Sequence, residues 1–148
     1  MSRHSCRCRW TGIWAATWGV VFAAPHVWWA FGVPAGFPGG ETGLAEALAV
    51  PWFRAYDLLV VALSAAAMLV AWSATRRQPV GIAVAWVICS ILLVRGLVGL
   101  MIDGVADLVW SPMFVVGGLL FGATARQCGH SASDLKRDSG AGANAAGT

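Results

Sequence analysis

The sequence predicts an all-α membrane protein, a transmembrane four-helix bundle with both termini in the cytoplasm. Three observations lead to this prediction. Only 11% of the 148 residues are charged, against roughly 25% in a soluble domain, and 58% are apolar. The apolar residues gather in four long stretches, and basic and acidic residues occupy different connections between them. The net charge of +3, without a long run of Lys and Arg, also excludes a strongly basic nucleic-acid binder.

Each of the four stretches is long enough to span a membrane, because about 20 helical residues cross about 30 Å of hydrocarbon. We expect helices at about 10–32, 55–75, 79–102 and 108–125. Pro51 and Pro79 stand near two of the helix starts, where the missing N–H of Pro costs nothing. Residues 1–9 form a basic flank, 41–49 a short surface helix, and 126–148 a disordered tail rich in Gly, Ala and Ser.

Charge placement predicts the orientation, since short cytoplasmic flanks are rich in Lys and Arg. The basic connections carry Arg3, Arg7, Arg9, Arg76, Arg77, Arg126, Lys136 and Arg137. The acidic connections carry Glu41, Glu46, Asp57, Asp103 and Asp107. We therefore expect a multi-pass protein with cytoplasmic termini. The alternative is a signal peptide cleaved after Ala23, which would leave three spans, although the first apolar stretch continues well beyond that position.

Two ionisable residues, His26 and Arg95, fall inside predicted spans, where a central charge costs about 2.5–3.5 kcal/mol on insertion scales. Each precedes the outer end of its helix by about six residues, which at 1.5 Å per residue places both roughly 9 Å below the outer surface. Pro25 denies the carbonyl of Val21 its helical partner, so we expect a kink beside His26. These residues are the first candidates for a function.

Two interpretations of this region stay open. In one, Arg95 extends outward and pairs with Asp57 or Asp103, which joins the helices structurally. In the other, an outward-facing pocket binds a small amphipathic or anionic molecule through His26, Trp29, Asp57, Arg95 and Asp103, with Glu41 as a further candidate. An aromatic belt near the outer surface is expected from Trp28, Trp29, Trp52, Tyr56 and Trp110. One intramembrane His supplies neither a haem pair nor a zinc site, so we expect no metal or cofactor.

The four cysteines do not follow a redox pattern. Cys6 and Cys8 lie in the basic flank, Cys89 in the third predicted span and Cys128 in the tail, and the CxxC of a thiol oxidoreductase is missing. We expect free, reduced thiols. A metal or an acyl chain held by Cys6 and Cys8 beside His4 is the alternative, on a weak signal.

Short motifs at the predicted helix ends resemble those of a known family. They are Ala24-Pro25-His26-Val27-Trp28-Trp29-Ala30-Phe31-Gly32, Tyr56-Asp57, Arg95-Gly96 and Trp110-Ser111-Pro112. The family comprises small bacterial four-helix membrane proteins catalogued as a domain of unknown function, and the resemblance covers about residues 12–125. It implies the same topology in a bacterial inner membrane and points to His26 and Arg95. Because the family has no assigned activity, the resemblance implies no reaction.

Three functions remain in view. We favour an accessory or ligand-binding bundle with an outward-facing polar pocket around His26 and Arg95. The second is an enzyme acting on a lipid or isoprenoid, with His26 as general acid or base and Asp57 orienting it. No nucleophile motif supports catalysis. The third is a dimeric, proton-coupled permease, since four helices enclose little aqueous space. The expected partners are the lipid bilayer, a small ligand and a second copy of the chain, with no nucleic acid.

Overall fold

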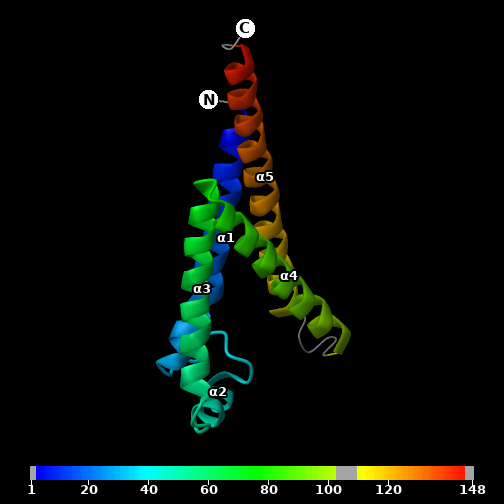
Figure 1. The fold of residues 1–148 in the computed structure, drawn as a ribbon. Helices are drawn as coiled ribbons and strands as arrows, with labels where there is room; N and C mark the ends of the chain where they lie inside the picture. The colour runs from blue at the N-terminus through cyan, green and yellow to red at the C-terminus, as the bar shows by residue number, and fades with distance from the viewer. Residues whose placement is uncertain (1–2, 103–109, 146–148) are drawn as a thin grey trace. The chain divides into compact units, whose positions relative to one another are not determined.

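The computed structural model describes residues 3–102 and 110–145, and these residues form five helices and no strand (Figure 1). The helices are α1 (Arg3–Ala30), α2 (Gly40–Leu48), α3 (Phe53–Thr75), α4 (Pro79–Ile102) and α5 (Trp110–Ala145). The predicted all-helical class is therefore confirmed. α4 has the bounds that the sequence predicts, because Pro79 fixes the start of the helix at a position where Pro is favourable.

Two of these helices, α3 and α4, are long and apolar enough to cross a membrane. Only 17% of the most apolar stretch of α3 and 22% of that of α4 is buried inside the protein. A core helix of a soluble protein is mostly buried instead, whereas these helices expose Leu63, Leu69 and Ile91. Exposed apolar surface of this extent is typical of contact with lipid.

The chain folds into two compact units, Ala16–Leu69 and the combination of Met1–Ala15 with Val70–Thr148. In the unit 16–69, α1 runs antiparallel to α3. The two helices approach closely at Gly19, where an added Cβ would lie 3.0 Å from Cγ of Met68. A Cβ there would also lie 3.7 Å from the carbonyl oxygen of Ser64, so Gly19 faces two successive turns of α3. The missing side chain of Gly19 thus lets α1 and α3 pack closely here.

The end of α1 is set by Gly32. This residue has φ +81°, a left-handed conformation that Gly adopts without steric cost. The N–H of Val33 donates to the carbonyl of Trp28 at 2.9 Å, and the N–H of Gly32 donates to that of Trp29 at 3.0 Å. These two bonds form a Schellman motif, which satisfies carbonyls left over at the helix end. The chain then leads through the Pro- and Gly-rich connection into α2, whose Leu44 is buried.

In the other unit, α4 and α5 are antiparallel. Four glycines indicate the register of α4 against α5, because Cβ atoms added to them would approach successive turns of the facing helix. Their nearest neighbours are Ser111 and Val115 for Gly96, Leu93 for Gly118, Cys89 for Gly122, and Ile82 for Gly129. Small residues thus let the two backbones approach.

Two helix boundaries differ from the prediction by more than two residues. α1 begins at Arg3 rather than near residue 10, and α5 continues to Ala145, although residues 126–148 are predicted to be a disordered tail. The chain contains no Pro after Pro112, so no residue in this region lacks the N–H that a helix needs. Side chains add local bonds there, from Nδ1 of His130 to the carbonyl of Arg126 and from Oγ of Ser133 to that of Gly129.

Candidate functional site

His26 and Asp57 form a buried pair between α1 and α3. Nδ1 of His26 lies 2.8 Å from Oδ1 of Asp57, and the two residues are 8% and 1% exposed. The antiparallel packing of α1 on α3 brings them together, because Asp57 lies in the first turns of α3 and His26 in the last turns of α1. A carboxylate at Nδ1 fixes the ring orientation and favours a proton on that nitrogen.

Aromatic side chains surround the imidazole along α1. The ring centroids of Phe22 and Trp29 lie 5.4 Å and 5.0 Å from that of His26. The series continues on both sides, with Trp18 stacked on Phe22 and with Phe37 against Trp29. These residues separate the His26–Asp57 pair from solvent and lower the local dielectric, which strengthens any polar interaction made there.

Trp29 is a corrected prediction within this cluster. The sequence places it in the outer aromatic belt with Trp28, but Trp29 is 5% exposed and Trp28 is 51% exposed. Successive residues point about 100° apart on a helix, so only one of two adjacent tryptophans can face the core. The indole N–H of Trp29 donates to the carbonyl of Ala35 at 3.1 Å, which ties the connection after α1 to the site.

The second carboxylate oxygen of Asp57 makes the pair unusual. Oδ2 is buried and accepts no hydrogen bond from any described residue. A buried acceptor without a donor costs about 1–3 kcal/mol, and more when it is charged. A water molecule or a ligand group that donates a hydrogen bond would remove this cost.

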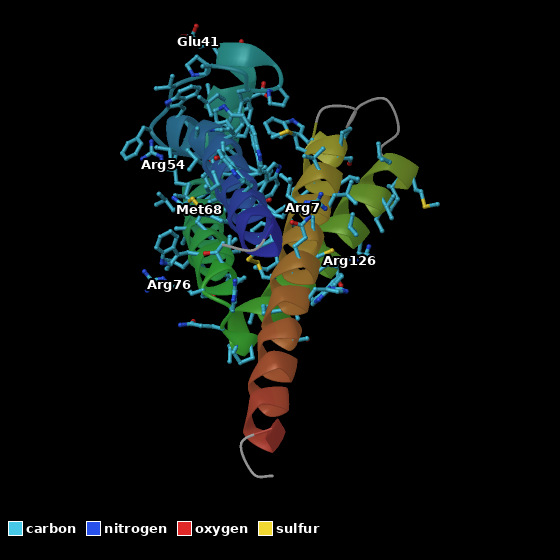
Figure 2. All side chains as sticks on the ribbon, turned by 90° about the horizontal axis from the view of Figure 1, so that it is seen from above. Arg7, Glu41, Arg54, Met68, Arg76 and Arg126 are labelled. Atoms are coloured by element: carbon cyan, nitrogen blue, oxygen red, sulfur yellow. A yellow bond between two sulfur atoms is a disulfide. The ribbon has the colours of Figure 1, made fainter. Side chains whose placement is uncertain are left out.

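The other predicted site residues that the structure describes belong to other helices. Arg95 belongs to the unit that contains α4 and α5, where its guanidinium carbon lies 5.2 Å from the ring centroid of Phe114. A cation over an aromatic face is favourable and helps to hold an arginine in an apolar region. Glu41 is exposed in the first turn of α2 and points outward in Figure 2. Asp103 lies outside the described residues.

The prediction of free thiols is wrong for two cysteines. Cys8 near the start of α1 and Cys128 in α5 form a disulfide, and both are buried. They lie 120 residues apart in the sequence, without a CxxC or any other local motif, so nothing in their spacing indicates the pairing. Cys89, in α4, is free and buried.

Beside the disulfide lies a pocket that the sequence does not predict, with a volume of about 720 Å³. Its lining residues come from α4, α5 and the start of α1: Arg7, Trp86, Cys89, Leu93, Leu119, Gly122, Ala123, Arg126, Gln127 and His130. In the sequence, Arg7 and Arg126 indicate only the orientation of the chain in the membrane. The signal in the sequence that could have indicated this pocket is a helical spacing. It places one set of lining residues on a single face of α5: Leu119, Ala123, Arg126 and His130.

No protein-family model, curated protein sequence or solved structure matches this chain. The resemblance carried by the motifs around His26, Asp57 and Arg95 therefore stays a prediction, and the site must be interpreted from its own geometry.

Proposed function

We propose that the chain is a multi-pass protein of a bacterial inner membrane, with four spanning helices and both termini in the cytoplasm. The Cys8–Cys128 bond requires both cysteines to lie on the same side of the membrane. This supports an even number of membrane crossings between them. Gly129 packs beside Ile82 in the first turns of α4, so Arg76, just before α4, lies at the same end of this unit as Arg126. Such a gathering of basic residues is typical of a cytoplasmic face.

The disulfide makes the orientation worth testing directly. Lasting disulfides are typical of oxidising compartments, and those of the cytoplasm are usually reversible. With cytoplasmic termini, a green fluorescent protein fused after residue 148 fluoresces, and alkaline phosphatase fused there is inactive. The opposite pattern would place both ends outside, where a lasting Cys8–Cys128 bond is expected, and would overturn this orientation.

Within that topology, we propose a non-catalytic, ligand-binding function centred on His26 and Asp57. The observation that carries this proposal is the buried Oδ2 of Asp57, which accepts no hydrogen bond from the described residues, beside an aromatic wall. The chemistry favours an amphipathic molecule whose hydroxyl or amino group donates to Oδ2 and whose apolar part contacts the aromatic rings. An anionic group is disfavoured at this position, because it would meet the Asp57 carboxylate.

The His26–Asp57 contact also favours one alternative, an enzyme in which Asp57 orients His26 as general acid or base. The ligand-binding proposal is preferred because a catalytic role needs a reacting group, and the sequence offers no nucleophile motif for one. Covalent turnover would leave a chemically altered molecule, whereas a bound ligand is released intact. Mass spectrometry distinguishes these outcomes.

The test is a comparison of bound small molecules in protein purified with its native lipids. We expect a molecule in the wild type, visible as density beside Asp57 and as a released mass, that is lost from the His26→Leu/Asp57→Leu double variant. Replacing both members of a buried ion pair by apolar residues often preserves stability, so this variant should fold. Ser64→Ala is the control, since Ser64 is buried on α3 and bonds the Val60 carbonyl of its own helix. The same molecules in all three proteins would contradict the proposal, as would water alone at Oδ2.

A further inference from the structure

We propose that the pocket between α4 and α5 binds an anionic membrane phospholipid, at a site separate from His26 and Asp57. Its volume of about 720 Å³ falls within the roughly 300–1,000 Å³ typical of small-molecule sites. Three properties of the pocket carry this inference: an apolar part, a cationic end, and a length that matches one leaflet of a bilayer.

The apolar part is formed by one face of each helix. Trp86 and Leu93 are seven residues apart on α4, and Leu119 and Ala123 are four apart on α5, so each pair lies on a single helical stripe. Gly122 lies between these stripes, and the Cβ that it lacks would sit 2.9 Å from Sγ of Cys89. Side chains that line this part offer no charge, which suits a hydrocarbon chain.

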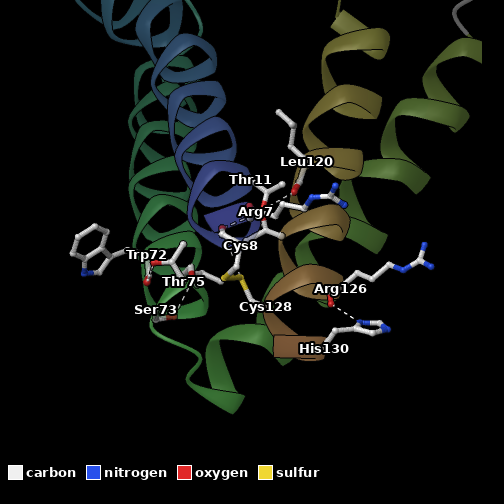
Figure 3. Close-up of a disulfide and its surroundings, with 12 residues drawn as sticks. Arg7, Cys8, Thr11, Trp72, Ser73, Thr75, Leu120, Arg126, Cys128 and His130 are labelled. Carbon is white, nitrogen blue, oxygen red and sulfur yellow. Dashed lines mark hydrogen bonds between the residues drawn. A yellow bond between two sulfur atoms is a disulfide. The ribbon is translucent and has the colours of Figure 1, made fainter. Parts of the chain in front are cut away.

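The cationic end is formed by Arg7 and Arg126, and His130 lines the pocket beside them. In Figure 3 the Arg7 side chain reaches from α1 toward α5, and those of Arg126 and His130 extend outward from neighbouring turns of α5; all three line the pocket. Arg7 and Arg126 are also labelled in Figure 2. None of the described residues that line the pocket is acidic. Nδ1 of His130 donates to the Arg126 carbonyl at 2.7 Å, which fixes the ring at this end of the pocket. Arginine guanidinium groups bind phosphate oxygens with two parallel hydrogen bonds, so this end suits a phosphate head group.

The two parts are arranged along the helix axis. From Leu119 to His130, α5 rises about 16 Å, which is close to half of the ~30 Å hydrocarbon thickness of a bilayer. Arg126 and His130 lie in the stretch of α5 that packs beside the start of α4, near which Arg76 stacks on the exposed Trp72 at 4.9 Å. Arg and Trp side chains together are typical of the membrane interface. A lipid in this pocket would thus have its head group at the interface and a chain within one leaflet.

The disulfide positions one of the cationic residues. Arg7 precedes Cys8, and Cys128 lies between Arg126 and His130 on α5, so the bond holds the first turns of α1 against the cationic end (Figure 3). Without the bond, Arg7 belongs to a helix end that is free to move from α5. We therefore expect the Cys8→Ser variant to bind the lipid more weakly than the wild type, as we expect for a variant that lacks the Arg7 side chain.

The experiment measures binding to the full chain in detergent micelles by native mass spectrometry and by the shift in Tm. Phosphatidylglycerol is the probe, phosphatidylcholine with identical acyl chains is the neutral control, and inorganic phosphate tests the head group alone. Each interfacial arginine changes anionic-lipid affinity about five-fold, so the Arg7→Gln/Arg126→Gln variant should raise the Kd for phosphatidylglycerol roughly 30-fold. Its affinity for phosphatidylcholine should stay within about two-fold of the wild type.

The matched control is Arg9→Gln/Arg76→Gln. It removes the same charge from the same end of the unit, and neither residue lines the pocket. An equal loss of phosphatidylglycerol affinity in both variants would overturn the proposal, because the effect would then come from net charge. Equal binding of phosphatidylcholine by the wild type would overturn it too, as would an equal Tm shift from inorganic phosphate.

A second measurement needs no substitution. A phosphatidylglycerol with a photoreactive group in its acyl chain should label peptides that contain Trp86, Leu93 and Leu119 in wild-type protein, and unlabelled phosphatidylglycerol should compete. Labelling of α3 to the same extent, or labelling that does not compete, would overturn the proposal. Failure of the His26–Asp57 proposal leaves these results unaffected, because the two sites share no residue.

Discussion

The packing of α4 on α5 yields a quantitative prediction, and the phospholipid pocket depends on it. Gly96 is buried in α4, and an added Cβ would lie 2.7 Å from Cγ2 of Val115, 2.9 Å from the carbonyl oxygen of Ser111 and 3.0 Å from the backbone N of Val115. Two of these atoms are backbone and cannot rotate away. The Gly96→Ala variant must therefore separate the helices by roughly 0.5–1 Å, which forfeits a quarter to a half of the local dispersion energy.

Gly129→Ala is the matched control, because a Cβ there would lie 3.8 Å from Cγ2 of Ile82, an ordinary contact. Both variants gain about 1 kcal/mol of helix propensity, so the difference between them isolates the packing cost. Overpacking typically costs about 1–3 kcal/mol, and we expect Gly96→Ala to be less stable than Gly129→Ala by that amount. Unfolding by titration with sodium dodecyl sulfate in micelles measures it. A difference below about 0.5 kcal/mol would refute the antiparallel register deduced from the glycines.

Three further predictions concern the other elements. His26→Leu and Asp57→Leu should each lower the free energy of unfolding by about 3–5 kcal/mol. The double variant should lose less than the sum of the two single losses, and additive losses would contradict a buried pair. Peptide mapping without reductant should recover Cys8 linked to Cys128, and dithiothreitol should separate them; alkylation of both thiols in unreduced protein would exclude the bond. Trp29→Phe should lower the free energy of unfolding by about 1 kcal/mol, because the indole hydrogen bond is lost. The control is Trp28→Phe at the exposed preceding position, which should leave it unchanged.

The site illustrates where sequence reasoning succeeds and where it stops. An ionisable residue in an apolar stretch is conspicuous in any membrane sequence, so His26 and Arg95 were identified from hydropathy and spacing alone. The sequence alone allows Asp57 to pair with Arg95 or to orient His26, because Asp57 opens a predicted helix and both residues are expected at the same depth. The structure pairs Asp57 with His26, and this depends on the rotation of α1 about its own axis, which depth does not determine.

Local chemistry along the chain determined the helical class, the bounds of α4 and the separation of basic from acidic connections, since each depends on neighbouring residues only. Tertiary structure alone decided the Cys8–Cys128 bond and the pocket that joins Arg7 to α5. These contacts connect residues more than a hundred positions apart, and they form where particular faces of two helices meet. The hydropathy of a segment predicts that it is a helix, but which face packs on which neighbour is determined by the close fit of small and large side chains across the interface.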